Sequence, residues 1–155
     1  MTDSVQAPEG FRPAHIHGDF IAFNGPLFGR HVEGQLQLGF RVEQRHTNPM
    51  GICHGGMLAT FADMLVPCAR MYLQGAERRF LPTISLQLDY LAPAALGTWV
   101  QGEAQILRTT RSMVFAQGLI SADGVPCVRM SGIFKLGQPY GDPDDRDLLR
   151  LHRHD

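Results

Sequence analysis

The sequence has no marked excess of charge of either sign, and its basic residues do not gather into runs. Of the 155 residues, 14 are lysine or arginine and 15 are aspartate or glutamate. A nearly neutral chain projects no broad electric field toward nucleic acid or an anionic membrane surface. We therefore expect neither nucleic acid nor a membrane among its partners.

Cysteine is scarce, and the N-terminus carries no recognisable targeting segment. The three cysteines, Cys53, Cys68 and Cys127, are odd in number and widely spaced, which fits neither a disulfide framework nor a zinc site. The stretch MTDSVQAPEGFRPAHIHGDF has early acidic residues and lacks the apolar segment of a signal peptide. This pattern indicates a cytoplasmic protein, and we expect no bound metal.

A hydrophobic run long enough to cross a membrane is also missing. The most apolar stretch, residues 57–73, is apolar at 13 of 17 positions and is a little short for a membrane span. It also contains Asp63, Pro67 and Arg70. We interpret it as a buried helix of a soluble protein.

Asp63 raises a question, because burying an unpaired carboxylate costs more than the surrounding packing could gain. One interpretation is structural: the acid pairs with an arginine or caps a neighbouring loop. The other is chemical, because an acid among apolar neighbours has a raised pKa and becomes a better base at neutral pH. Pro67 lacks the N–H that would bond the Asp63 carbonyl, so we expect the helix to bend there.

The remaining pattern is that of a sheet built around this helix. Alternating apolar and polar residues predict strands in residues 34–42, 84–92, 98–110, 112–122 and 127–136, and Asp123-Gly124 predicts a two-residue hairpin turn. A helix that is apolar nearly all round can be wrapped by five or six antiparallel strands. We therefore predict one α+β domain over residues 18–137, an irregular arm over 1–17 and a polar tail over 138–155.

The loop before the helix adds polar groups: Asn48, His54, and then Gly55 and Gly56 at the expected helix start. The free N–H groups and the dipole of a helix start favour a negative oxygen, and glycine lets a ligand approach closely. Alternatively, the glycines only permit a tight corner and the histidine only caps the helix. Together with Asp63, the set suits acyl transfer, which needs donors for a carbonyl oxygen and a base or nucleophile for its carbon.

The acid and the helix start are too far apart in one chain to share one small carbonyl. About eight residues, at a rise of 1.5 Å each, place Asp63 roughly 12 Å from the helix start. A two-fold dimer would bring Asp63 of one subunit to the helix start of the other. We therefore predict a homodimer with active sites at the subunit interface.

The segment HTNPMGICHGGMLATFAD resembles the Asn-x5-His-Gly-Gly-x6-Asp signature of hotdog-fold acyl-CoA thioesterases. It is most similar to the phenylacetate-pathway thioesterases and the thioesterase superfamily member 2 group. TISLQLDYLAPAALG and LRTTRSMVFAQG resemble the next strand and hairpin of that family, so the likeness covers about residues 35–135. It implies a hotdog fold in a dimer, often a tetramer, that hydrolyses acyl-CoA without a metal or organic cofactor.

The resemblance also implies a role for each catalytic residue. Asp63 would be the nucleophile or general base. The Gly55 N–H and the Asn48 amide would polarise the thioester carbonyl, and His54 would help to hold the acyl group or the departing thiolate. Thr83 stands where the family has a serine that positions the attacking water.

Substrate contacts are expected at further positions. Arg111 and Ser112 lie where the family often contacts coenzyme A, although Arg111 could equally be a solvated hairpin charge. Gly56 is also expected to contact the substrate. The acyl pocket is expected to be lined by apolar and flexible residues: Met50, Ile52, Phe61, Met64 and Phe80. Such a pocket suits aromatic and medium-chain acyl groups equally.

Two other functions fit the same fold less well. A non-catalytic module that binds acyl-CoA as a sensor or scaffold would need only the groove, whereas this chain carries every polar member of the motif. A hotdog dehydratase or hydratase would need a histidine and an acid placed to move protons at the second and third acyl carbons, and this spacing does not match. We therefore predict an acyl-CoA thioesterase.

Overall fold

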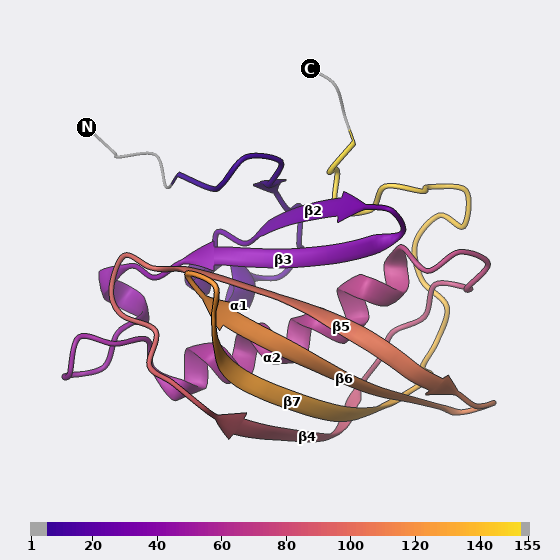
Figure 1. Ribbon diagram of the computed structural model, residues 1–155. Coiled ribbons are helices and arrows are strands. Elements are labelled where there is room, and N and C mark those ends of the chain that lie inside the picture. The colour runs from indigo at the N-terminus through magenta and orange to yellow at the C-terminus, as the bar shows by residue number, and fades with distance from the viewer. Residues whose placement is uncertain (1–5, 153–155) are drawn as a thin grey trace.

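One long helix lies against one face of a single antiparallel sheet (Figure 1). The computed structural model describes residues 6–152. Its elements are β1 (Arg12–Pro13), α1 (Asp19–Asn24), β2 (Phe28–Val32), β3 (Gln35–Arg41), the short 3-10 helix η1 (Gln44–His46), α2 (Gly55–Met71), β4 (Thr83–Tyr90), β5 (Trp99–Thr109), β6 (Met113–Ala122) and β7 (Val125–Lys135). The helix α2 contacts β3, β4, β5 and β6. The predicted α+β hotdog fold is confirmed.

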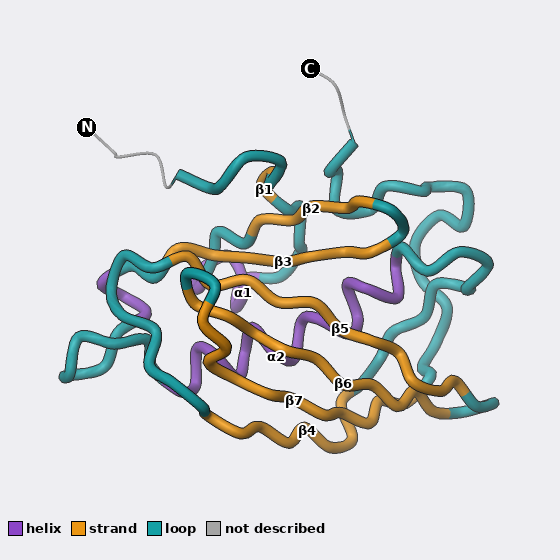
Figure 2. The backbone as a smooth tube through the Cα atoms, in the orientation of Figure 1, coloured by secondary structure: helices purple, strands orange, loops and turns teal. Residues whose placement is uncertain are grey.

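The sheet has seven strands, in the order β1-β2-β3-β5-β6-β7-β4, and every neighbouring pair is antiparallel (Figure 2). The sequence predicts five or six strands. The additional strand is β1, which has two residues and pairs with β2. It lies inside the segment 1–17, which was expected to be irregular. Two residues are too few to show the alternation that predicts a strand.

The turn between β6 and β7 forms at the predicted Asp123-Gly124 pair. Both residues have a positive φ, 45° and 82°, and Ala122 pairs with Val125 across the turn. Positive φ at both central positions gives the turn that matches the right-handed twist of a hairpin. The hairpin places β7 between β6 and β4, so β4 is an edge strand.

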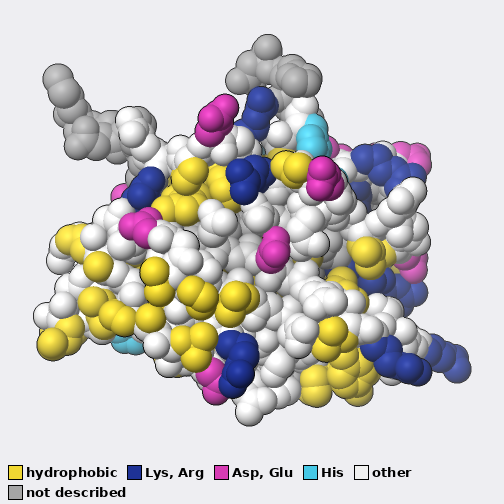
Figure 3. All heavy atoms as spheres, viewed as in Figure 1, with side chains coloured by type: hydrophobic (Ala, Val, Ile, Leu, Met, Phe, Trp, Pro, Cys, Tyr) yellow, Lys and Arg dark blue, Asp and Glu magenta, His cyan; other side chains and the backbone are white. Residues whose placement is uncertain are grey.

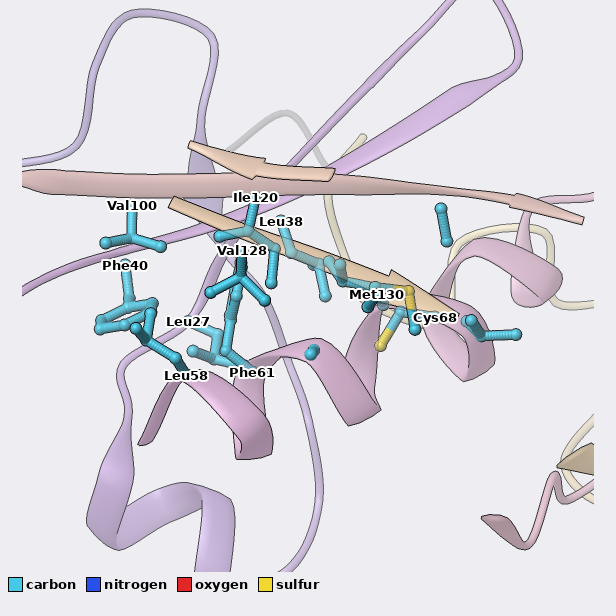
Figure 4. Close-up of a cluster of buried hydrophobic side chains, with 14 of the residues drawn as sticks. Leu27, Leu38, Phe40, Leu58, Phe61, Cys68, Val100, Ile120, Val128 and Met130 are labelled. Atoms are coloured by element: carbon cyan, nitrogen blue, oxygen red, sulfur yellow. The ribbon is translucent and has the colours of Figure 1, made fainter. Parts of the chain in front are cut away.

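Apolar side chains of α2 form the core together with the facing side of the sheet. Phe61 and Leu65 are at most 1% exposed, and the Phe61 ring lies 5.1 Å from that of Phe40 in β3. Figure 4 shows Leu58 and Phe61 of the helix facing Ile120 of the sheet. Full burial of such a side chain stabilises the fold by about 1.5–3 kcal/mol. No helix within residues 6–152 is long and apolar enough to cross a membrane.

The two ends of the described chain pack against each other and against the core. The His15 N–H donates to the Leu149 carbonyl at 2.9 Å. Leu149 and Leu151 are 2% and 5% exposed, respectively, and belong to the main core. The segment 138–155, expected to be a polar tail, therefore supplies two core leucines because these alternate side chains turn inward.

All three cysteines are free and buried. Burial raises the pKa of Cys53 and that of Cys68 to about 12. Burial also raises the pKa of Cys127. Thiols with such pKa values stay protonated, and therefore weakly nucleophilic, at neutral pH.

Candidate active site

The helix α2 begins at Gly55, and His54 caps it. The His54 Nδ1 accepts a hydrogen bond from the Gly56 N–H at 2.8 Å. Because Nδ1 is the acceptor, a neutral His54 carries its proton on Nε2. Within residues 6–152, no backbone carbonyl accepts from the Gly55 N–H, so this donor stays available at the positive end of the helix dipole. The capping role that the sequence left open for His54 is thus observed.

The two glycines have different surroundings, and only Gly56 is tightly packed. A Cβ atom at Gly56 would lie 3.0 Å from the His54 Nδ1, a tight contact that would require the cap to shift by a few tenths of an ångström. At Gly55 the added atom would lie 3.4 Å from the Tyr90 hydroxyl, and that hydroxyl donates to the Gly55 carbonyl at 2.7 Å. The tight corner therefore accounts for Gly56, while Tyr90 of β4 holds Gly55 from its carbonyl side.

Asn48 shapes the loop that leads to the helix. Its side-chain Oδ1 accepts from the Met50 N–H at 3.0 Å. Its backbone N–H donates to the Ile52 carbonyl at 2.9 Å, and its carbonyl accepts from the Gly51 N–H at 3.0 Å. Gly51 has φ +73°, which glycine adopts readily. The amide oxygen is thus committed to the loop, and the amide Nδ2 is the side chain's donor for a ligand.

Asp63 is held by a hydroxyl group and not by an opposite charge. The Thr83 hydroxyl, at the first residue of β4, donates to the Asp63 Oδ1 at 2.6 Å. Asp63 is partly exposed, and none of the four ion pairs in the described part of the chain involves it. The arginine pairing that the sequence left open is therefore not observed. The carboxylate tolerates its apolar helix because it faces outward from the core.

The polar residues form two groups along α2. His54 and Gly55 lie at the helix start, with Asn48 in the loop before it. Asp63 with Thr83 lies about two turns further along α2, roughly 12 Å away at 1.5 Å per residue. The structure thus brings Thr83 onto Asp63 but keeps both away from the donors within one chain. No group of three or more His, Cys, Asp or Glu side chains in residues 6–152 is placed to hold a metal ion.

The predicted substrate contacts are spread over the molecule. Met50 is 81% exposed on its loop, and Phe61 has no exposed surface, so Phe61 belongs to the core and does not line a pocket. Met64 and Phe80 do line a pocket of about 570 Å³. Arg111 and Ser112 are exposed in the β5–β6 hairpin, which Figure 1 places at the opposite end of the sheet from the start of α2.

Sequence reasoning missed two features of this region. Tyr90 was noted only as part of a strand, yet its hydroxyl holds the helix start. The walls of the pocket beside Met64 come partly from residues 15–17, Tyr140 and residues 148–150, which were expected to belong to an arm and a tail. The only signal in the sequence was the pattern LLRL at residues 148–151, where apolar residues interrupt a charged stretch.

Residues 50–128 match the family model of the thioesterase superfamily, and the chain therefore belongs to that superfamily. The matched region contains the start of α2, Asp63 and Thr83. Membership of this superfamily makes the protein a thioester hydrolase, which is the enzyme class predicted from the motif.

Individual relatives agree with this assignment. A Pseudomonas aeruginosa protein provisionally named an esterase is 28% identical over 133 residues, covering 85% of this chain and 98% of that protein. Mouse acyl-coenzyme A thioesterase 13 is 33% identical over 107 residues, covering 62% of this chain and 74% of that protein. The crystal structure of zebra fish thioesterase superfamily member 2 shares 26% identity and a TM-score of 0.63, over 72% of this chain and 81% of that one. The predicted likeness to this group is confirmed.

Proposed function

We propose that the protein hydrolyses acyl-CoA thioesters to a free acid and coenzyme A, with Asp63 as the general base or nucleophile. The observation that carries the proposal is the Thr83–Asp63 hydrogen bond of 2.6 Å on a partly exposed carboxylate without an ion pair. A structural acid would be expected to have a cationic partner. A catalytic one needs only to be oriented, because it must accept a proton or attack a carbon.

In the proposed reaction, a water oxygen adds to the thioester carbonyl carbon and Asp63 takes the proton. The Thr83 hydroxyl, whose proton is directed at Asp63, has lone pairs that can orient this water. The carbonyl oxygen becomes negative and accepts hydrogen bonds from the Gly55 N–H and the Asn48 amide. The C–S bond then breaks, and the thiolate leaves and takes up a proton. Direct attack by Asp63, followed by hydrolysis of the anhydride, requires the same positions.

The proposed site is shared between two chains. Asp63 and the donors at the helix start are separated in one chain, and a second copy related by a two-fold axis would supply the missing half. The strand β4 offers the contact, since it pairs only with β7 and exposes Ile84 and Tyr90, at 51% and 53%. Figure 3 shows two groups of apolar side chains in the lower part of the molecule, to the left and to the right of a basic and an acidic side chain. An unpaired strand edge readily adds a further strand.

We expect the active protein to sediment as at least a dimer of 17.2 kDa chains. Analytical ultracentrifugation in assay buffer, with activity measured on the same sample, checks this. The physical reason is that one chain alone cannot place both halves of the site on one carbonyl. A fully active species with the mass of a single chain would contradict the shared site, while a tetramer made of such dimers would be consistent with it.

The substrate is proposed to be an aromatic or medium-chain acyl-CoA in the cytoplasm. A screen of acetyl-, hexanoyl-, octanoyl-, dodecanoyl-, palmitoyl- and phenylacetyl-CoA, with free thiol as the readout, tests this. The buried cysteines of the protein, with raised pKa values, should contribute little to the thiol signal. We expect hexanoyl-, octanoyl- or phenylacetyl-CoA to give the highest kcat/KM. Release of coenzyme A no faster than in heat-inactivated samples, for every thioester, would refute the proposed function.

A further inference from the structure

We propose that the pocket between α2 and the two ends of the chain receives the acyl group and limits its length. This inference rests on the proposed thioesterase function. The pocket has a volume of about 570 Å³, within the usual range for small-molecule sites of about 300–1,000 Å³. Its walls come from one face of α2, residues 79–82 before β4, residues 15–17, Tyr140 and residues 148–150. The occupant is an apolar acyl group larger than acetyl.

The pocket adjoins the catalytic carboxylate. On the helix side its wall begins at Met64, which directly follows Asp63. On the sheet side it ends at Pro82, which directly precedes Thr83. Asp63 and Thr83 are themselves joined by their hydrogen bond of 2.6 Å. An acyl chain whose carbonyl carbon lies against Asp63 therefore has this pocket as its neighbouring apolar space.

The lining suits a hydrocarbon or an aryl ring. The helix side presents Met64 and Met71, whose flexible thioethers adapt to different shapes. Phe80 and Tyr140 stack on each other, with centroids 4.4 Å apart and planes 27° apart, and add a flat aromatic wall.

The charges at the pocket are largely compensated. Arg79 pairs with Glu77 at 2.9 Å, and Arg150 pairs with Asp145 at 2.7 Å. Neither arginine is therefore an unpaired charge waiting for an anionic ligand. The occupant that remains is apolar, because burying it removes hydrocarbon surface from water without stranding a charge.

Pro67 forms part of the pocket wall on the helix side. Proline is the least favourable residue inside a helix, yet Pro67 lies within α2 and its ring lines the pocket. It stands four residues, about one turn, beyond Asp63, and so on the same side of the helix. A rigid ring at this point gives the wall a fixed shape, which a flexible side chain would not.

The walls from the chain ends are fixed to the rest of the fold. The Asp147 carboxylate accepts from the Tyr72 hydroxyl at 2.9 Å, the Leu151 N–H at 2.8 Å and the His152 N–H at 2.9 Å. Tyr72 is the residue that ends α2. These walls lie outside residues 50–128, the region that matches the family model. The helix side and residues 79–82 lie inside the matched region, so only the walls from the chain ends are specific to this chain. Those walls are where acyl selectivity can vary while the catalytic residues stay the same.

The test compares Leu148→Trp, which fills the pocket from the C-terminal wall, with Leu107→Trp. Leu148 is half-buried and lines the pocket, whereas Leu107 is 55% exposed on β5 and lies outside it. We expect Leu148→Trp to lower kcat/KM for octanoyl- and dodecanoyl-CoA at least about tenfold relative to acetyl-CoA, because a filled apolar pocket discriminates by chain length. Leu107→Trp should keep the wild-type profile.

A second variant covers the case in which the tryptophan at 148 prevents folding. Leu148→Ala enlarges the pocket and should move the preferred acyl length upward. Profiles identical to wild type in both folded variants would overturn the acyl assignment while leaving the thioesterase function intact. Conversion to a monomer with an equal loss for all thioesters would assign the pocket to the subunit contact instead. A wild-type protein that hydrolyses no thioester would refute the proposed function itself.

Discussion

Asp63→Asn is expected to reduce kcat about 10²- to 10⁴-fold, the usual contribution of a positioned base, with little change in KM. The substitution is nearly isosteric, and the amide oxygen of asparagine can still accept the Thr83 hydroxyl, which now donates to the Asp63 Oδ1 at 2.6 Å. Geometry and substrate contacts should therefore survive while the base or nucleophile is lost. Steady-state kinetics on the best thioester of the screen measure the effect, and a loss confined to kcat indicates an interaction made during chemistry.

Asp89→Asn is the matched control for this experiment. Asp89 also belongs to the α2–β4 half of the fold, but its carboxylate is exposed and pairs with Arg129 at 3.0 Å on the surface. An exposed pair of this kind is worth about 0–1 kcal/mol, so turnover should stay close to wild type. If folded Asp63→Asn protein turned over substrate at the wild-type rate, Asp63 would be a structural residue and the proposed mechanism would fall.

Asn48→Ala is expected to lower kcat about 10²- to 10³-fold, the typical cost of losing one oxyanion donor. The alanine also loses the acceptor for the Met50 N–H, so a second variant separates the two effects. Asn48→Asp keeps an oxygen for Met50 but replaces the donor with a negative charge near the developing oxyanion. It should therefore be at least as slow. An unchanged rate in both variants would show that Asn48 does not donate to the thioester carbonyl oxygen. The Gly55 N–H would then be the donor that remains.

Variants of Thr83 show whether positioning the attacking water contributes less to catalysis than the Asn48 donor to the carbonyl oxygen. Thr83→Ser keeps the hydroxyl that bonds Asp63 and should be mild, whereas Thr83→Ala removes it and should lower kcat by less than Asn48→Ala does. The reason is that Asp63 can hold the attacking water partly by itself. Kinetics of the three variants on one thioester, at one pH, give the order. Wild-type rates for Thr83→Ala would show that the hydrogen bond of 2.6 Å has no catalytic role.

The elements with a strong periodic signal were predictable. The apolar run at residues 57–73 became α2, and the alternating stretches became β3 to β7. Asp123-Gly124 set its hairpin because turn chemistry is local. The strand β1 and the buried leucines of residues 149 and 151 depend on contacts between the two ends of the chain. Such contacts leave no periodicity in a short segment, so they could not be predicted.

The candidate site also has features that the sequence predicted and features that it did not. The motif predicted which residues stand at the helix start and which acid follows, because spacing along a helix fixes their separation. The motif leaves two roles open for His54, and the structure shows that its imidazole caps the helix through the Gly56 N–H. The expectation that Phe61 lines the acyl pocket was wrong, because periodicity alone does not say which face of an apolar helix meets the sheet. Phe61 packs on Phe40 instead.

The strand β4 is tied to α2 at both of its ends. The hydroxyl of its first residue, Thr83, donates a hydrogen bond to Asp63. The hydroxyl of its last residue, Tyr90, donates to the Gly55 carbonyl. The same strand forms the open edge of the sheet. If a second copy docks on that edge, dissociation removes the partner's donors and also loosens the strand that orients the acid. Specific activity would then rise with enzyme concentration and level off once the dimer is saturated, so dilution alone would act as a switch.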